Sequence, residues 1–329
     1  MSVKQIIEEI EKEVIDVTKT TFVHNVTEVV PGISDSGLTY ESGKDKKGKK
    51  ITTCVLYVDI RNSVALTEKH HNLTMGRVYT AFTKAVLKLA RHHKGHTRNI
   101  IGDRIMILFP SKNCYNNAVH CAISINHVAE KIINKQFNVD FKCGIGIDHG
   151  ELRVIKVGIQ RNGNENGENK GLVWVGYPAN LASRLTDVAN KTMEREYYEV
   201  IRYPINPRAI KPTYHSLSDL LGNSSYDPNA PLYLSHTEKV ELSVDEFADS
   251  FRQLANGSLF TVGGKIIKFT KKTISHKFPP ILLSETVFKG YKAAAPDAID
   301  IKNNWWKDQN YPIPNIKGKV YGKYLTWDI

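Results

Sequence analysis

The segment that most constrains the fold of this chain is residues 53–63, TCVLYVDIRNS, where a run of β-branched and aromatic residues ends in one acidic residue. Such a run predicts a buried β-strand, and Asp59 stands where that strand gives way to a tight loop. A carboxylate at the tip of a strand is a candidate metal ligand. Because Asp is also common in turns after strands, this residue alone does not establish a site.

A second acidic residue follows in a similar setting. Residues 99–104, NIIGDR, predict a short apolar strand and a glycine turn with Asp103, before another strand at 105–109. The residues from 74 to 93 have the apolar spacing of a helix. A strand, a helix and then a hairpin place both aspartates at one end of a single sheet. Two carboxylates at one point suit Mg²⁺ or Mn²⁺ that carries a polyphosphate.

The composition leaves the partner open. The chain has 329 residues, enough for one large domain with insertions or for two domains. Its net charge of +11 allows an anionic partner, namely a nucleotide, nucleic acid or membrane surface, but scattered basic residues more often form a solvated face. We expect a cytoplasmic protein with no membrane partner, since no leader or spanning segment is seen. Four cysteines without CxxC spacing favour reduced thiols: Cys54, Cys114, Cys121 and Cys143.

Further elements are predicted from the apolar pattern. Helices are expected at 3–17 and 115–135, and two strands at 140–149 and 151–159 around a turn at Asp148-His149-Gly150. Residues 160–171 are polar and rich in Gly and Asn, which is typical of a hairpin tip. Three histidines, His92, His93 and His96, end the first long helix, where the helix dipole favours them without any metal.

A strand at 172–176 leads into a helix that starts at Tyr177, with Pro178 in its first turn. Asn180 and Arg184 are four residues apart and share one helical face. Such a pair is ordinary helix surface. Beside a triphosphate, the amide would instead orient a sugar and the guanidinium group would hold a phosphoryl group.

The composition of the sequence changes in its last third. Residues 201–277 are polar and contain prolines, with a helix expected at 243–256 and a hairpin at Gly263-Gly264. A strand that runs into a helix resumes the core at 280–287, and a terminal strand is expected at 316–327. We therefore predict an N-terminal helix and linker (1–50), a core (51–200), an insertion (201–278) and the end of the core (279–329).

Together these pieces resemble the catalytic domain of the class III nucleotide cyclases, the family of adenylate and guanylate cyclases. The resemblance covers residues 53–191 and 280–329. It rests on four motifs in family order: YVDI at 57–60, IGD at 101–103, NLASR at 180–184 and IKGK at 316–319. It implies an α/β (α+β) fold, a ferredoxin-like sheet with flanking helices and an insertion before the last core strands. It also implies a head-to-tail homodimer with each active site shared between two subunits.

The resemblance assigns roles to single residues. Asp59 and Asp103, with the carbonyl group of Ile60, match the ligands of two divalent metal ions, Mn²⁺ or Mg²⁺. Asn180 matches the residue that orients the ribose, Arg184 the one that stabilises the transition state, and Lys317 the one that meets the triphosphate. The expected contacts with the rest of the nucleotide come from Tyr57, Asn99, Ile101, Val173 and Val175.

Three positions depart from the purine cyclases. Asn99 replaces the Lys of adenylate cyclases and the Glu of guanylate cyclases, and Val173 replaces a base-reading Asp or Cys. The loop Arg61-Asn62-Ser63 lacks the usual Gly-Phe. The chain thus resembles the pyrimidine cyclases of bacterial antiphage systems, which make cyclic CMP or cyclic UMP for a separate effector. An Asn amide pairs with either pyrimidine edge. We expect CTP slightly ahead of UTP.

Two rival functions belong to other classes. A non-catalytic dimeric nucleotide-binding module should have lost a ligand, yet Asp59, Asp103, Asn180 and Arg184 are all present. A nucleic-acid-binding protein needs aromatic and basic residues interleaved on one face, and we find no such face, so no nucleic-acid partner is expected. The expected reaction is attack of the 3′-hydroxyl group on the α-phosphorus, which expels pyrophosphate.

Overall fold

The chain forms two compact units. The computed structural model describes residues 2–39, 45–61, 63, 68, 72–161, 164–210, 226–253, 257 and 259–329. Unit 1 comprises Met1–Thr192 and Lys277–Ile329, and unit 2 comprises Met193–His276. The sequence pattern placed the insertion at 201–278, so unit 2 begins earlier than that pattern suggested.

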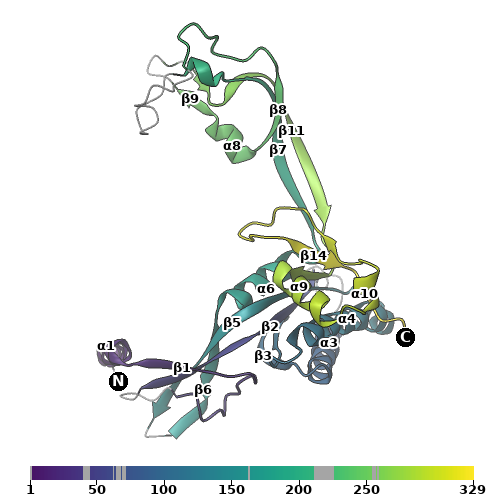
Figure 1. Ribbon diagram of the computed structural model, residues 1–329. Coiled ribbons are helices and arrows are strands. Elements are labelled where there is room, and N and C mark those ends of the chain that lie inside the picture. The colour runs from purple at the N-terminus through teal and green to yellow at the C-terminus, as the bar shows by residue number, and fades with distance from the viewer. Residues whose placement is uncertain are drawn as a thin grey trace. The chain divides into compact units, whose positions relative to one another are not determined.

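Unit 1 is built on one mixed nine-stranded sheet (Figure 1). Its main path runs β13-β14-β12-β5-β2-β4-β3, with β1 paired to β2 and β6 paired to β5. The strands are β1 (Phe22–Val26), β2 (Lys46–Arg61), β3 (His96–Ile101), β4 (Arg104–Leu108), β5 (Lys142–Arg161), β6 (Asn164–Val175), β12 (Ile281–Ser284), β13 (Lys307–Asp308) and β14 (Val320–Lys323). The expected α/β sheet with flanking helices is confirmed, and β2, β3 and β4 are the predicted strand and hairpin.

The described helices of unit 1 are α1 (Val3–Lys19), α3 (Asn72–His92), α4 (Cys114–His127), α6 (Tyr177–Val188), α9 (Glu285–Ala294) and α10 (Ile299–Lys302). A π-helical stretch (Val128–Ile133) and a short helix α5 (Asn134–Phe137) continue α4. Alternate β2 residues, such as Leu56 and Val58, pack against α3, α4 and α9. Their neighbours Ile51 and Val55 pack with Ala179 and Ala182 of α6 on the other face.

A glycine lets α6 lie close to the sheet. A Cβ atom on Gly146 of β5 would lie 2.4 Å from both the carbonyl oxygen of Ala182 and the backbone nitrogen of Thr186. The Thr186 hydroxyl group also donates a hydrogen bond to the Tyr57 carbonyl group at 3.2 Å. Helix α6 is therefore fixed directly above the end of β2.

Strand β5 corrects one prediction. The expected turn at Asp148-His149-Gly150 does not exist, because these residues pair with Val55, Cys54 and Thr53 in one continuous strand. Asp148 is buried, and burial raises its pKa while a hydrogen bond with Ser284 opposes that rise. The sequence Asp-His-Gly is typical of a turn, but here these residues lie within a strand in the middle of the sheet.

Two further elements differ in length from their predictions. The hairpin at 160–171 is present, but β5 and β6 stay paired as far as Arg161 and Asn164, so its tip is shorter than the polar segment. Residues 162 and 163 lie outside the described residues. The terminal strand expected at 316–327 spans only Val320–Lys323, where it pairs with β12.

Unit 2 has its own small sheet. Strand β7 (Thr192–Pro204) lies between β8 (Glu238–Ser243) and β11 (Gly264–Lys277), and β9 (Phe251–Gln253) pairs with β10 (Leu259–Thr261). A 3₁₀ turn spans Pro207–Ala209. The helix expected at 243–256 is the shorter α8 (Val244–Asp249), because β9 follows it; residues 254–256 lie outside the described residues. Its Phe247 stacks on Tyr198 of β7 with ring centroids 4.0 Å apart.

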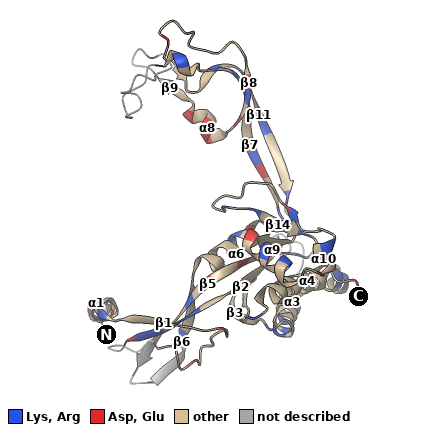
Figure 2. Cartoon of the chain, viewed as in Figure 1, with Lys and Arg blue, Asp and Glu red and all other residues tan. Residues whose placement is uncertain are grey.

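The charges of unit 2 balance. Lys and Arg residues along β11 (Figure 2) meet acidic residues of β7, as in the Lys271–Glu196 pair at 2.7 Å. Residues 193–276 contain equal numbers of basic and acidic side chains. The whole net charge of +11 therefore belongs to the sequence of unit 1.

The segments of unit 1 that flank unit 2 are held together. The Asn190 amide donates to the Pro279 carbonyl group at 3.0 Å, and the Phe278 amide donates to the Lys191 carbonyl group at 2.8 Å. These residues follow α6 and precede β12. The chain therefore leaves and re-enters unit 1 at one point.

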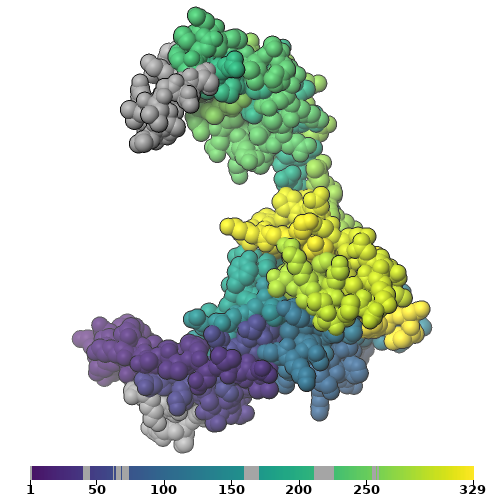
Figure 3. All heavy atoms as spheres, in the orientation of Figure 1, coloured from purple at the N-terminus to yellow at the C-terminus, as the bar shows by residue number. Residues whose placement is uncertain are grey.

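The N-terminal helix α1 buries none of its residues in this chain. Its apolar side chains, including Ile7, Ile10 and Val14, are about half exposed, and Figure 3 shows its surface in the darkest purple. Helix α1 is the helix expected at 3–17, and it does not pack into the core of its own chain. Within the described residues, none of the helices is both long and apolar enough to cross a membrane.

Candidate active site

Asp59 meets Arg104 at the end of β2. The register of β2 with β4 pairs Val58 with Ile105, so the next pair along is Asp59 and Arg104. Arg104 Nη2 lies 3.1 Å from Asp59 Oδ2, Arg104 Nη1 donates to Ser183 Oγ at 2.8 Å, and the guanidinium group also pairs with Asp187. Burial lowers the pKa of Arg104, but its bonds with Asp187 and Asp59 raise the pKa overall. Arg104 thus ties the strand end to α6.

Arg61 is a buried second partner of Asp59. Its side chain is 3% exposed, and its Nη1 lies 3.2 Å from Asp59 Oδ2. Its Nε donates to the Ala189 carbonyl group at 2.7 Å, and its Nη2 donates to that of Thr186. Burial lowers the pKa of Arg61, and Asp59 works against that shift. Arg61 therefore joins β2 to the end of α6; its neighbour Asn62 lies outside the described residues.

Asp103 lies in the turn between β3 and β4, after Gly102 with a φ of 60°. Burial raises the pKa of the nearby Tyr79 phenol, and the charges of Asp103 and Asp59 raise it further. Because Asp103 directly precedes Arg104, the residue that contacts Asp59, both predicted metal ligands lie at one end of the sheet. Ile60 follows Asp59 with its side chain in the core, 4% exposed, so its backbone carbonyl group is the part left for a site.

The donor set fits a hard divalent cation. Two carboxylates and a backbone carbonyl oxygen are the ligands that Mg²⁺ and Mn²⁺ prefer, with water and substrate oxygens in the other positions. Arg61 and Arg104 both donate hydrogen bonds to Oδ2 of Asp59. Among the residues that the structure describes, no group of three His, Cys, Asp or Glu side chains forms a metal cage.

The expected base-contacting residues lie partly on the same face as Asp59. Tyr57 of β2 is opposite Met106 of β4, and Met106 is opposite Asn99 of β3, so these three form one row across the sheet. Burial raises the pKa of Tyr57, and nearby Arg104 opposes that rise. Asn99 is exposed on the edge strand, beside Ile101.

Val173 and Val175 are not brought to that row within one chain. They pair with Ile155 and Arg153 of β5 and are 43% and 49% exposed. They alternate along β6 with Trp174, which packs on the α6 side of the sheet. The two valines therefore lie on the opposite face.

A second group gathers at the outer side of α6. Asn180 and Arg184 are exposed there, and Arg184 Nη1 donates to the Asn315 carbonyl group at 2.8 Å. Two residues later Lys317 borders a cavity of about 200 Å³, which is also lined by Leu181 and Leu185 of α6. The structure thus brings Arg184 and Lys317 to one region and Asp59 and Asp103 to another.

Four residues of the site were not selected from the sequence: Arg61, Arg104, Ser183 and Asp187. Arg104 directly follows Asp103 at the start of β4, and the antiparallel pairing of β4 with β2 places it next to Asp59, so this register would have identified it. Ser183 and Asp187 are four residues apart on α6, which puts both within reach of one guanidinium group. Arg61 is two residues from Asp59 on the same strand, but its other partners are backbone carbonyl groups far along the chain, which the sequence does not indicate.

The sequence of this chain is similar to those of known proteins. The profile of the adenylate and guanylate cyclase catalytic domain matches residues 46–193. A uridylate cyclase of Burkholderia cepacia is 31% identical over 171 residues, which cover 50% of this chain and 70% of that protein. A uridylate cyclase of Xanthomonas perforans is 28% identical over 184 residues, covering 51% of this chain and 75% of that protein.

A solved structure is also similar. An adenylyl cyclase from P. aeruginosa has a TM-score of 0.47 and 13% identity, covering 86% of this chain and 98% of that chain. The family of this chain is assigned from sequence instead. Its similarity to the protein from Burkholderia cepacia and to the catalytic-domain profile shows that this chain belongs to the class III nucleotide cyclases.

Proposed function

We propose that this protein is a pyrimidine nucleotide cyclase that converts UTP to 3′,5′-cyclic UMP and pyrophosphate. The observation that carries the proposal is Asn99, an amide in the cross-strand row with Tyr57, beside the carboxylate of Asp59. An amide offers one donor and one acceptor group to a base edge, whereas Lys offers donors alone and Glu acceptors alone. The bulk of Tyr57 favours a single ring over a purine.

The choice of UTP over CTP rests on the relatives. An Asn side chain pairs with cytosine or uracil by turning its amide over, so the residues suit both bases. Two relatives, 31% and 28% identical, are named uridylate cyclases, which favours UTP over the CTP expected from the sequence. Synthesis of cyclic CMP is the second candidate. In either case the product would act as an antiphage signal to a separate effector.

Asp59, Asp103 and the Ile60 carbonyl group would hold two divalent ions. Such ions, when bound, lower the pKa of the attacking 3′-hydroxyl group and neutralise the leaving phosphates. Asn180 would orient the ribose, and Arg184 would stabilise charge that grows on the α-phosphoryl oxygens. Lys317 would hold the triphosphate beside Arg184, and this positioning, with fixed charge, supplies most of the acceleration.

Each complete site would need two subunits. The acidic group and the Arg184–Lys317 group occupy separate regions of one chain, joined through α6. Exposed apolar residues line the edge strand and the β5–β6 hairpin, with Ile101 at 66% and Val173 at 43%. Such apolar exposure is typical of a protein–protein interface. A homodimer would bring Val173 of one subunit toward the nucleotide and create two shared sites.

The test is a competition among substrates. Purified protein is incubated with ATP, GTP, CTP and UTP at equal concentrations and Mn²⁺, with Asp103→Asn protein as the control. Cyclic UMP should dominate, and the control should form no product. If cyclic CMP is the main product, only the assigned substrate changes, from UTP to CTP. Dominant cyclic AMP or cyclic GMP would refute the pyrimidine assignment, and binding of nucleotide without any product would favour the non-catalytic module.

A further inference from the structure

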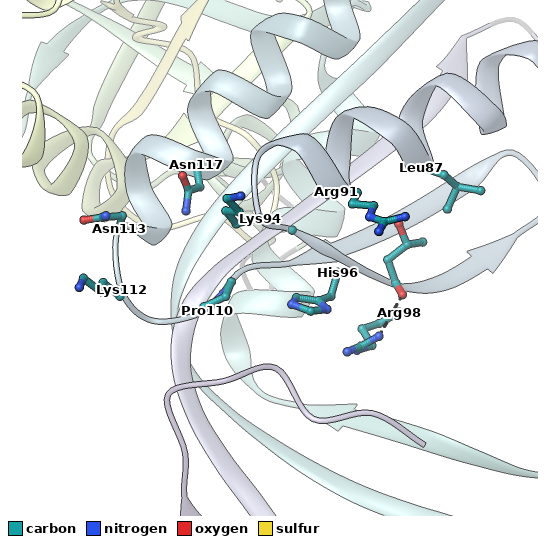
Figure 4. A pocket seen from close by; sticks show the side chains of 11 residues that line it. Leu87, Arg91, Lys94, His96, Arg98, Pro110, Lys112, Asn113 and Asn117 are labelled. Carbon is teal, nitrogen blue, oxygen red and sulfur yellow. Dashed lines mark hydrogen bonds between the residues drawn. The ribbon is translucent and has the colours of Figure 1, made fainter. Parts of the chain in front are cut away.

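A second cavity lies in unit 1, away from the turn that carries Asp103. It has a volume of about 880 Å³ and is formed by the end of α3, the start of β3 and the loop after β4. Figure 4 shows its labelled side chains, which come from these three segments and, in the case of Asn117, from the first turn of α4. Five of them are basic or imidazole groups: Arg91, Lys94, His96, Arg98 and Lys112.

The cavity has one sign of charge. None of the described residues that line it is acidic. Helix α4 begins at Cys114, immediately after the lining residues Lys112 and Asn113, so the positive end of its dipole adds to the cationic side chains. Low-dielectric walls that carry one sign of charge concentrate the field and attract counter-ions.

Arg98 is held inside this field by the backbone. Its Nη2 donates to the Val30 carbonyl group at 3.2 Å and its Nη1 to that of Thr97 at 3.4 Å, while its Nε is buried and has no hydrogen-bond partner. Burial lowers the pKa of Arg98. Among the described residues no carboxylate pairs with Arg98, so an anion in the cavity would stabilise the charge of this partly buried guanidinium group.

Arg98 reaches the cavity through a β-bulge. Thr97 pairs with Ile107 and Asn99 with Met106, so Arg98 is an extra residue on β3 without a partner on β4. A bulge re-aims one side chain out of the regular alternation of a strand. The bulge therefore supplies a cation here without disturbing the residues on either side.

A solvated basic face would explain only part of this cluster. The helix dipole accounts for Arg91 near the C-terminus of α3, but not for Arg98 on β3 or Lys112 in the loop. Scattered surface lysines point to solvent, whereas these groups line one concave volume. The cluster is also in the unit that carries the whole net charge of the chain.

We propose that this cavity binds a small polyphosphorylated ligand at a site separate from Asp59 and Asp103. Its volume of about 880 Å³ lies within the range of small-molecule pockets. The described lining residues include no Phe, Tyr or Trp, so the cavity lacks the stacking surfaces that single-stranded nucleic acids use. Recognition therefore rests on the phosphate chain of the ligand.

The test titrates sodium tripolyphosphate into the full-length protein by calorimetry, with EDTA present so that no metal bridges the anion to Asp59 or Asp103. One saturable site per chain is expected. The double variant Arg91→Gln and Lys112→Gln changes two exposed side chains and should weaken binding at least tenfold. The charge-matched variant Lys292→Gln and Lys307→Gln, also exposed and outside the cavity, should bind like the wild type.

Three results would overturn the proposal. Equal weakening in both double variants would mean that tripolyphosphate responds only to net charge. Binding that is lost in Lys317→Gln but kept in the Arg91 and Lys112 variant would place the anion in the proposed catalytic site. Tighter binding of a single-stranded oligonucleotide than of tripolyphosphate, lost in the same cavity variant, would assign the surface to nucleic acid. None of these measurements depends on cyclase activity.

Discussion

Arg104 Nη2 lies 3.1 Å from Oδ2 of Asp59, and the same guanidinium group holds Ser183 of α6 through its other nitrogen at 2.8 Å. The carboxylate that we expect to bind metal is therefore also one of the anchors between the sheet and α6. Asp103, its expected partner in metal binding, has no such structural role in the described contacts. The two aspartates should respond differently to substitution.

Asp59→Asn and Asp103→Asn should both abolish cyclisation, but only Asp59→Asn should lower the free energy of unfolding. The Asp59 side chain is 15% exposed and pairs with Arg61, which is 3% exposed, so its loss leaves a buried guanidinium group with less compensation. Hydrogen bonds to charged groups contribute about 1.5–3 kcal/mol each. Urea unfolding and a product assay measure the two effects. Retained turnover in either variant would contradict the assignment of that residue as a metal ligand. Equal free energies of unfolding for the two variants would contradict the role of Asp59 in anchoring α6 to the sheet.

Mixing two inactive proteins should restore activity if the sites are shared. Asp59→Ala and Arg184→Ala proteins should each be inactive, because each lacks one required group in every site. Asp59 and Arg184 lie in separate regions of one chain, so a shared site would take them from different subunits. After subunit exchange, each heterodimer should contain one intact site. Mass spectrometry of differently tagged chains verifies the exchange. Exchange without recovered cyclic nucleotide would place both residues in one subunit's site.

Gly146→Ala should displace α6 and reduce both stability and activity. The new Cβ atom would lie 2.4 Å from the backbone of Ala182 and of Thr186, which cannot move without shifting the helix that carries Asn180 and Arg184. Overpacking of this kind typically costs about 1–3 kcal/mol. Gly171→Ala is the matched control, because a Cβ atom there meets nothing within 4 Å. Thermal unfolding compares the two, and equal melting temperatures would contradict the close approach.

His93 should make unit 1 sensitive to acid. Its Nε2 lies 2.9 Å from Ser124 Oγ, which accepts a bond from Trp327 Nε1 at 2.8 Å, so the serine proton is free to donate to a neutral His93. Burial, followed by the neighbouring His92 and His120, lowers the pKa of His93 to about 4. At a pH between these two values, His93 therefore binds a proton more weakly in the folded state than in the unfolded state.

Stability from this group is present above the ordinary His pKa of 6.5 and is lost as the pH falls from there toward about 4. The melting temperature of His93→Gln protein should therefore depend less steeply on pH in this window than that of the wild type. The difference between the two curves isolates His93 from the carboxylates. Parallel curves would show that this histidine does not carry the effect.

Removal of unit 2 should leave unit 1 folded. The Lys191 carbonyl group and the Phe278 amide are 2.8 Å apart, so Asn-Gly in place of residues 193–276 closes the gap as a tight turn. The shortened protein should unfold cooperatively in urea with a native-like midpoint. A gradual transition would mean that unit 2 contributes to the stability of unit 1.

The elements that a few neighbouring residues specify could be predicted from the sequence. The apolar run before Asp59, the turn at Gly102 and Asp103, and Pro178 in the first turn of α6 each specify an element within a few residues. Long-range pairing was not predictable in this way. Asp148 has the sequence context of a turn residue and is recognised as a strand residue only from its pairing with β2. The burial of Arg61 depends on carbonyl groups at the end of α6 as well as on Asp59.

The bulge at Arg98 also decides which side chain the proposed pocket presents to the base. Without the bulge, β3 would continue in regular register from the Thr97–Ile107 pair, with Arg98 opposite Met106 in the row now occupied by Asn99. A cationic guanidinium group would then stand beside Tyr57 in place of a neutral amide. Under the proposed function, the preference for a base thus depends on the pairing register of β3 as well as on the identity of its residues.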